Sequence, residues 1–578
     1  MAKKKLIYAR LFAVLLTTVF LVACTAPQET TTVNNTNTAA QETPTSIPTN
    51  TAPQETPTAK IEAEPVKPPL MNETGLPIVN EPVTLKFAAA QADIFKPGFE
   101  GIEMLERWEK ETGITIEWDT YPAASWGERK SQIIASGELP DVFAGGGAVG
   151  QQTLTEQEVL AWAKQGIIIP LGDLIDKYMP RFKQILEENP VYKENIMSPD
   201  GNVYSFPATA DIDFGQKGAL LYINRKWLEE TGRTLPVKGE KHYNYLDHKF
   251  TTDEFYELLK DFKRIHPEGI PFSAVRDGQP LGGLFDMYGA FGQKDDTNRL
   301  IVQNDNVIFT ADKEPWKEAT KYFHKLYSEG LMDPEYFTQD YATYLAKVAK
   351  KPLVVGVSLM WTNHQAEPDI TSADYRNWLL TAPLVGKDGQ QNWNLRAKGS
   401  GIGGFVITAT NPHPEISARF QDYLYEEENS YQLSMGPLGR NTEKGADGMI
   451  TMNNMPEGMS DAEWRGQNLN TMFITTPAMN SKVIWSDLVQ MTIDQGAFIK
   501  KYSLADKITR MYPRIQFNAE DSEKLATLKT DILEYVTEMQ AKWITEGTID
   551  QDWDDYLKKL DQIGLAEYLE IMQRNLNR

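Results

Sequence analysis

The spacing of apolar residues changes several times at the start of the aromatic-rich part of the chain, and each change predicts a new element. The stretches 83–88, 114–118 and 141–144 carry the short apolar runs of buried strands. Between them, residues 99–112 and 126–136 repeat apolar side chains every three or four positions and are followed by glycine, as amphipathic helices are. Strands that alternate with helices favour a doubly wound, mostly parallel sheet.

The same two spacings recur farther along the chain. Thr251 and Glu254 predict a capping box at the start of an amphipathic helix. The runs 352–357 and 405–408 predict two more buried strands, and 522–546 predicts a long helix with one apolar stripe. We therefore expect an α/β fold of two lobes, each with a central, mostly parallel sheet flanked by helices. Ligands of such sheets bind beyond the carboxyl ends of the strands.

The beginning of the chain has a different pattern. Four basic residues lie within residues 3–10, an apolar run follows over 11–22, and small residues precede Cys24. This is the pattern of a secretory signal peptide, here residues 1–23, which is too short to span a bilayer. The sequence LVAC that ends at Cys24 resembles the lipobox of bacterial lipoproteins. The alternative is an ordinary secretory signal in which Cys24 is incidental.

The lipobox resemblance implies that Cys24 becomes the first residue of the mature chain and carries a diacylglyceryl group. Two acyl chains, such as palmitate, are enough for a stable membrane anchor, whereas one is not. We interpret residues 24–80 as a tether between the lipid anchor and the folded part of the chain. They are rich in threonine and proline, contain no aromatic residue and repeat the pentapeptide APQET. Such a composition predicts a disordered spacer.

Charge and cysteine content exclude several classes of function. The formal net charge of −22 argues against a nucleic-acid partner and against electrostatic binding to anionic lipid. A single cysteine allows no internal disulfide, so stability outside the cell must come from the hydrophobic core. We find no nucleophile elbow and no zinc-binding helix motif, and we expect neither an enzyme, nor a cofactor, nor a metal.

Short motifs in a fixed order resemble the extracellular solute-binding proteins (family 1) of carbohydrate ABC transporters, and in particular the LplA-type lipoproteins of Gram-positive bacteria. The motifs extend over nearly the whole chain after residue 80, although each of them is loose when taken alone. They are ETGI at 111–114, SGELPDV at 136–142, PDGNVYSFP at 199–207, LYINRKWL at 221–228, YSEGL at 327–331, APL at 382–384, DG at 388–389, WDDY at 553–556 and GL at 564–565.

The resemblance implies a periplasmic-binding-protein-like fold over 81–578, with a ligand held between two lobes joined by hinge crossings. We place the first lobe at about 81–205 plus 352–410, and the second at about 206–351 plus 411–578. The crossings are expected near 205–215, 350–360 and 400–410. The implied partners are a sugar and the permease subunits of an importer, at the extracellular face of the cell membrane, and we expect a monomer.

Sugar recognition requires flat apolar faces and polar groups for hydroxyls, so we selected aromatic and polar residues near predicted strand ends. Trp361 and Asn363 follow a predicted buried strand directly and are the first choice. A glycine run after another strand would let backbone N–H groups approach a ligand. The other candidates are Tyr204, Asp211, Asp213, Phe214, Trp126, Gly145, Gly146, Gly147, Trp393 and Trp464. For each tryptophan, the alternative to ligand binding is packing in the hydrophobic core. For Asp211 and Asp213, the alternative is a place in a solvated turn.

Other readings of the chain stay open. Some relatives carry a calcium loop after the helix that corresponds to residues 252–265, but here residues 266–271 lack the oxygen ligands, so we predict no calcium there. Residues 237–250 predict either a loop over the ligand or a decoration of the surface. Two alternative functions remain. One is a surface glycoside hydrolase or lyase. The other is a sugar-sensing or adhesive lipoprotein without a transporter.

Overall fold

The computed structural model describes residues 70–91, 97–145, 153–208, 217–239, 243–276, 283–368, 372–395, 401–456, 459, 461–470, 472, 474, 479–503, 509–513 and 515–577. All of them belong to one unit, Lys67–Arg578. Within these ranges, no helix has both the length and the apolar content that crossing a membrane requires. The predictions for Cys24 and for the tether up to residue 69 lie outside the described residues.

A five-stranded sheet with the order β2-β1-β3-β13-β4 forms the centre of one part of the fold. Strand β1 is parallel to β2 and β3, whereas β13 is antiparallel to β3 and β4. The strands predicted in residues 83–144 are thereby confirmed. The bounds are β1 (Val83–Gln91), β2 (Ile114–Pro122), β3 (Val142–Ala144), β4 (Phe206–Ala208) and β13 (Gly401–Ile407).

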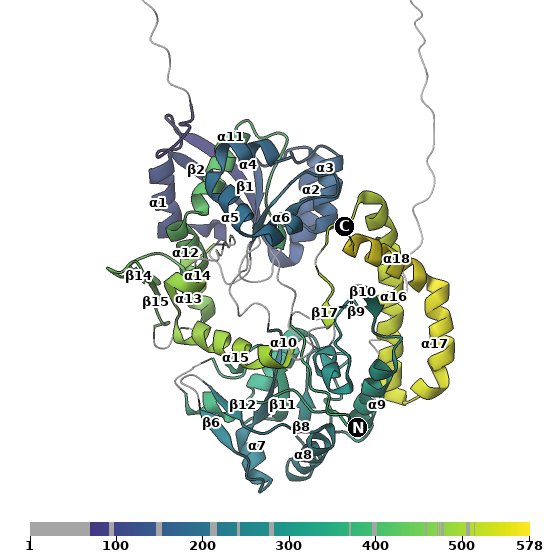
Figure 1. Ribbon diagram of the computed structural model, residues 1–578. Helices are drawn as coiled ribbons and strands as arrows, with labels where there is room; N and C mark the ends of the chain where they lie inside the picture. The colour runs from purple at the N-terminus through teal and green to yellow at the C-terminus, as the bar shows by residue number, and fades with distance from the viewer. Residues whose placement is uncertain are drawn as a thin grey trace, which may run out of the picture. The chain divides into compact units, whose positions relative to one another are not determined.

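Hydrophobic clusters cover both faces of this sheet, because successive strand residues point to opposite faces. Phe87 and Val142 pack with side chains of α1, α4, α5, α6 and α11, whereas Ala88 and Phe143 pack with α2 and α3. Figure 1 shows several of these helices around β1. The bounds are α1 (Glu103–Thr112), α2 (Trp126–Ser136), α3 (Glu156–Lys164), α4 (Gly172–Tyr178), α5 (Pro180–Glu188), α6 (Pro190–Ile196), α11 (Pro414–Leu424) and α12 (Glu427–Met435).

A six-stranded sheet with the order β6-β7-β12-β5-β11-β8 forms the second centre. All five residues of β5 are buried, and β5 is antiparallel to both β11 and β12. Strand β8 is parallel to β11, and β7 is parallel to β12. The bounds are β5 (Leu220–Asn224), β6 (Val237–Gly239), β7 (Asn244–Leu246), β8 (Ile270–Ser273), β11 (Val355–Met360) and β12 (Trp378–Leu380).

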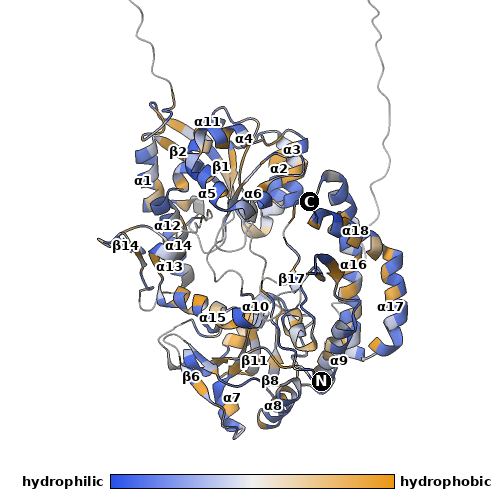
Figure 2. Ribbon diagram, viewed as in Figure 1, coloured by the Kyte–Doolittle hydropathy of each residue, from blue (hydrophilic) through white to orange (hydrophobic). Residues whose placement is uncertain are grey.

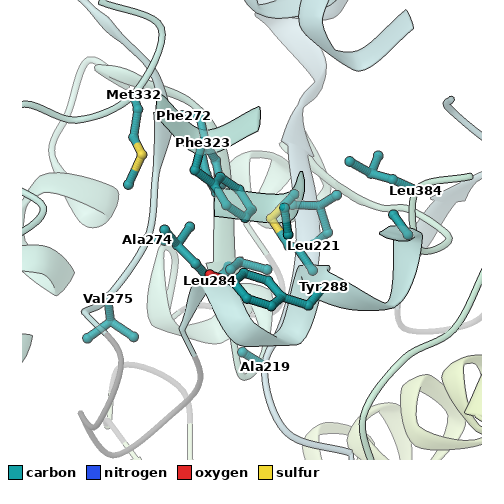
Figure 3. Packing of buried hydrophobic residues seen from close by; sticks show 14 of the residues in the cluster. Ala219, Leu221, Phe272, Ala274, Val275, Leu284, Tyr288, Phe323, Met332 and Leu384 are labelled. Atoms are coloured by element: carbon teal, nitrogen blue, oxygen red, sulfur yellow. The ribbon is translucent and has the colours of Figure 1, made fainter. Parts of the chain in front are cut away.

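Helices from distant parts of the chain share the core of the second sheet. Leu221 of β5, Phe272 of β8 and Tyr288 belong to one cluster with Phe323 of α9 (Figure 3). Figure 2 shows orange and blue residues alternating along α16 and α17, as in amphipathic helices. The bounds are α7 (Arg225–Glu230), α8 (Thr252–Ile265), α9 (Glu314–Ser328), α10 (Tyr341–Ala349), α15 (Asp487–Ser503), α16 (Ala519–Glu546), α17 (Ile549–Ile563), α18 (Leu565–Leu576) and the 3₁₀ helix Leu284–Phe291.

Two small sheets and two short helices complete the described elements. One sheet has the order β14-β15-β16, and the other has the order β10-β9-β17. The capping box at Thr251 and the long helix predicted over 522–546 are both present, in α8 and α16. The bounds are β9 (Leu300–Gln303), β10 (Asn306–Phe309), β14 (Thr442–Lys444), β15 (Ile450–Met452), β16 (Val483–Ile484), β17 (Thr509–Met511), α13 (Asp461–Asn468) and α14 (Met479–Lys482).

Strand pairing differs from the predicted division into lobes. We expected 352–410 to belong with 81–205, but β11 and β12 pair with β5 in the six-stranded sheet. We also expected 411–578 to belong with 206–351, but α11 and α12 pack on the five-stranded sheet. From here on, the first lobe means the residues packed on the five-stranded sheet, and the second lobe means those packed on the six-stranded sheet.

Two connections join the lobes through β4 and β13 of the first lobe. Strand β4 of the first lobe ends at Ala208, and β5 of the second begins at Leu220. The chain returns between residue 395 and the start of β13 at Gly401. These connections fit the crossings predicted near 205–215 and 400–410. A crossing near 350–360 does not occur, because β11 lies inside the second sheet with β5 and β8 as neighbours.

Residues 70–80, which we expected to be part of the disordered tether, form an ordered segment against the first lobe. Ile78 and Val79 are buried, and their backbone N–H groups donate to the last carbonyl oxygen of α1. The guanidinium group of Arg419 on α11 donates to the backbone oxygen of Asn72. Two buried apolar side chains and these hydrogen bonds hold the segment, so the ordered part of the chain includes residue 70.

A buried ion pair in the loop before β9 is tied by hydrogen bonds to α9 and α16 of the second lobe. The side chains of Asp295 and Arg299 are 0% and 3% exposed. The Asp295 carboxylate also accepts hydrogen bonds from Thr310 and Trp316, and Arg299 donates to Gln540 on α16. Burying two charges is costly, so such a pair depends on the additional hydrogen bonds that satisfy it.

We predict that Arg299→Met lowers the free energy of unfolding by about 3–5 kcal/mol, because it leaves the Asp295 carboxylate buried without its cation. Urea denaturation followed by tryptophan fluorescence measures this loss. The matched control is Arg225→Met, which breaks a pair with Glu229 whose side chains are 40% and 61% exposed, and about 0–1 kcal/mol is expected there. Equal losses in both variants would contradict the prediction.

Candidate functional site

The end of β11 lies beside the start of β5, and this pairing builds the candidate site. Met360 is opposite Leu220 in the antiparallel register. The next residue along β11 is Trp361, and the residues before Leu220 come directly from the connection between the lobes. Trp361, the first choice from the sequence, therefore lies at the sheet edge from which that connection leaves.

Trp361 is half-buried and has a cation against its ring. The ammonium nitrogen of Lys217 lies 4.2 Å from the centroid of the indole ring and donates a hydrogen bond to the backbone oxygen of Trp361. Lys217 itself is buried. A cation over an indole face is attracted by the negative potential of that face. The contact orients the ring at the sheet edge.

A glutamine fixes the backbone of Trp361 and reaches a second aromatic residue. The backbone N–H of Trp361 donates to Gln365 Oε1 at 2.6 Å. Nε2 of Gln365 donates to the hydroxyl oxygen of Tyr341 at 2.5 Å. Tyr341 is half-buried, and burial raises the pKa of its hydroxyl to about 12. Trp361 and Tyr341 are therefore joined through one side chain.

Asn363 serves the packing of the second lobe. Its side chain is fully buried, its Nδ2 donates to the backbone oxygen of Tyr375 at 3.0 Å, and its Oδ1 accepts a 3.4 Å hydrogen bond from Gln495 on α15. Gln495 also accepts a hydrogen bond from the Tyr222 hydroxyl. The residue is thus occupied by a buried polar network beneath Trp361, although the sequence suggested that it contacts the ligand.

The other three tryptophan candidates are buried. Trp393 is 1% exposed and donates its indole N–H to the backbone oxygen of Ala219 at 3.1 Å. Trp126 donates to the backbone oxygen of Thr153 at 2.9 Å and stacks on Tyr121. Trp464 on α13 is 9% exposed. The indole N–H groups of Trp126 and Trp393 are thus used in hydrogen bonds within the fold, as is common for buried tryptophan.

Tyr204 and Gly145 lie in the first lobe with local partners. The Tyr204 hydroxyl donates to Asp200 at 2.7 Å, and burial together with this hydrogen bond raises its pKa. The backbone N–H of Gly145 donates to the oxygen of Gly404 at 2.7 Å, so a ligand would have to compete for it. The remaining candidates lie outside the described residues; they are Gly146, Gly147, Asp211, Asp213 and Phe214.

The structure adds residues that the sequence analysis did not select. Lys217, Tyr341 and Gln365 lie with Trp361 in the second lobe. In the first lobe, half-buried Tyr121 near the end of β2 donates to Asp119, and burial and this carboxylate raise its pKa to about 12. The only signal in the sequence was position, since Tyr121 comes three residues after the strand predicted over 114–118.

The region where some relatives carry a calcium loop is filled by side chains. The rings of Trp227 and His266 stack with centroids 3.9 Å apart, and Glu230 lies 2.6 Å from His266. A Cβ at Gly269 would lie 2.4 Å from the Trp227 ring. Within the described ranges, no group of three or more His, Cys, Asp or Glu residues is placed to hold a metal ion.

Residues 90–431 match the family model of bacterial extracellular solute-binding proteins. The chain belongs to this family. This solute-binding protein is 31% identical over 523 residues to the fructooligosaccharide ABC transporter substrate-binding protein FusA of Streptococcus pneumoniae, across 86% of this chain and 90% of the relative. It is 24% identical over 370 residues to lipoprotein LipO of Bacillus subtilis, across 60% and 65% of the two chains.

A solved structure of Streptococcus pneumoniae FusA in complex with kestose is similar to this solute-binding protein with a TM-score of 0.73, at 30% identity, across 86% of this chain and 99% of that one. The fold is therefore periplasmic-binding-protein-like, as the sequence motifs implied. The described residues near these strand ends include the half-buried rings of Trp361, Tyr341 and Tyr121 and the hydroxyl groups of the two tyrosines. These are the groups that a polyhydroxylated ligand needs, with apolar contact from the rings and hydrogen bonds from the polar groups.

Proposed function

We propose that this solute-binding protein captures an oligosaccharide for an ABC importer, and that the oligosaccharide belongs to the fructooligosaccharide class. The observation that carries the proposal is the 31% identity to FusA across 86% of the chain. The half-buried Trp361 at the edge of the second sheet supports it, because a flat indole face suits the C–H face of a sugar ring.

The proposed mechanism uses both lobes. The sugar binds between them, close to the two connections that join β4 to β5 and residue 395 to β13, and the lobes close around it. The closed form then docks on the permease subunits. We propose that the protein acts as a monomer and performs no chemistry on the sugar, so incubation with kestose should release no fructose.

Isothermal titration calorimetry should show binding of kestose and of nystose, with an affinity in the micromolar range, about −8 kcal/mol. Fructose, sucrose and maltotriose are the comparison ligands. Weaker binding is expected because fructose and sucrose are shorter than kestose and maltotriose contains no fructosyl unit. If maltotriose bound tightly and kestose did not bind, the fructooligosaccharide class would be wrong, and the ligand would instead be a glucose oligosaccharide. Failure of every oligosaccharide to bind would overturn the proposed function.

We predict that Trp361→Ala weakens kestose binding by about 2 kcal/mol, roughly thirtyfold, because it removes the proposed ring contact. The change should leave the urea midpoint nearly unaltered, since the indole is half-buried. Trp485→Ala is the matched control, because Trp485 is also a half-buried tryptophan but packs on the small cluster around Tyr431. Unchanged affinity in the Trp361 variant would show that the ligand contacts other residues.

We also propose that Cys24 is lipidated and anchors the chain to the outer face of the cell membrane of a Gram-positive bacterium, with residues 25–69 as the spacer. Cys24→Ser should move the protein from the membrane fraction to the culture medium, because the two acyl chains are lost. Cell fractionation and immunoblotting measure the distribution. A variant that stays in the membrane fraction after a salt wash would contradict the lipid anchor.

A further inference from the structure

Tyr341 occupies a defined position at the same sheet edge as Trp361. It is the first residue of α10, which begins where the Asp340 side chain accepts a hydrogen bond from the backbone N–H of Thr343. Figure 1 shows α10 next to β11. The Tyr341 ring stacks on Tyr344, with centroids 6.3 Å apart and an angle of 26°. The ring is therefore held in place, and it stays half-exposed.

The hydrogen bonds around Gln365 determine which way its amide points. The backbone N–H of Trp361 can only donate, so the group that receives it must be the oxygen Oε1. The amide nitrogen is then the group directed at Tyr341, and it can only donate. The hydroxyl oxygen of Tyr341 is consequently an acceptor in this contact, and its own proton points elsewhere.

That proton is present at neutral pH and has no acceptor within the part of the chain that the structure describes. Burial raises the pKa of the hydroxyl to about 12, so it stays protonated. The contact with Gln365 is the hydrogen bond in which the hydroxyl takes part. A half-buried hydroxyl that accepts from an amide and keeps a proton to donate is suited to an oxygen atom of a ligand.

We propose that Tyr341 contacts the sugar and donates its hydroxyl proton to a hydroxyl, ring or glycosidic oxygen, and that Gln365 is a positioning residue that couples Tyr341 to Trp361. This role rests on the proposed function, because it concerns the same bound sugar. In this proposal the second lobe supplies the Trp361 ring for stacking on the sugar and the Tyr341 hydroxyl as a hydrogen-bond donor of fixed direction. Gln365 contacts no ligand atom and sets the direction of the donor.

The first test is calorimetry of Tyr341→Phe with kestose. Loss of one neutral hydrogen bond predicts about threefold to tenfold weaker binding, with the thermal midpoint little changed. Tyr256→Phe is the matched control, because it also removes one hydroxyl, which donates to Glu329 on the surface of α8 and α9. Wild-type affinity in Tyr341→Phe would overturn the role of the hydroxyl.

The second test is Gln365→Glu, which separates the direction of the proton from the position of the rings. A carboxylate still accepts the Trp361 N–H, but it also accepts the Tyr341 proton and so removes it from the sugar. We expect a loss as large as in Tyr341→Phe, no further loss in the double variant, and a retained change in tryptophan fluorescence on binding. Additive losses would overturn the coupling through Gln365.

The proposed function and the role of Tyr341 are distinguished by different outcomes. If the wild-type chain binds none of the oligosaccharides, the proposed function is overturned, and the role of Tyr341 with it. If the wild-type chain binds kestose and Tyr341→Phe and Gln365→Glu bind it equally well, the proposed function stands and the role of Tyr341 alone is overturned. Gln365→Met, whose thioether sulfur is only a weak acceptor for the Trp361 N–H, should weaken binding and also reduce the fluorescence change.

Discussion

The antiparallel pairing of β5 with β11 is the constraint on which the site depends. Because β5 begins where β11 ends, the register that sets Leu220 opposite Met360 also brings the chain that arrives from the first lobe against Trp361. Lys217 can reach the indole only for this reason. A shift of one residue would turn every side chain of β5 to the opposite face, and Tyr222 and Asn224 would then lose their hydrogen bonds to Gln495 and to the backbone oxygen of Val355.

Beneath the sheet edge, a satisfied polar network gives the site its rigidity. Gln495 of α15 bridges the Tyr222 hydroxyl and the Asn363 amide, and Trp393 donates to the backbone at the start of β5. Buried polar groups of this kind are costly unless they are paired, and once paired they favour a single arrangement. Asn363 and Trp393, which the sequence presented as candidate ligand contacts, are thus buried in this network.

Local features of the fold could be predicted from the sequence, and the pairing of distant strands could not. The elements of residues 83–144 and the helix that starts at Thr252 follow from apolar spacing and a capping box, which are properties of neighbouring residues. The apolar run at residues 352–357 predicted only a buried strand. No feature of the neighbouring residues indicates that this strand, β11, pairs with β5. Residues 70–80 were predicted as tether because their few apolar residues, including the buried Ile78 and Val79, weigh little in the composition of residues 24–80 as a whole.

The same limit explains which site residues were found. Trp361 follows directly from a strand, so its place at a sheet edge was predictable, whereas the burial of Trp126 and Trp393 depends on backbone oxygens far away in the sequence. Tyr341 lies on a helix that the apolar pattern did not indicate, and its importance appears only through Gln365. Because that amide must present its oxygen to the Trp361 N–H, the direction of the tyrosine proton is decided by a backbone group rather than by the ligand. In the role proposed for Tyr341, such preorganisation lowers the entropic cost of binding, and Gln365 sets what the site accepts without contacting the ligand.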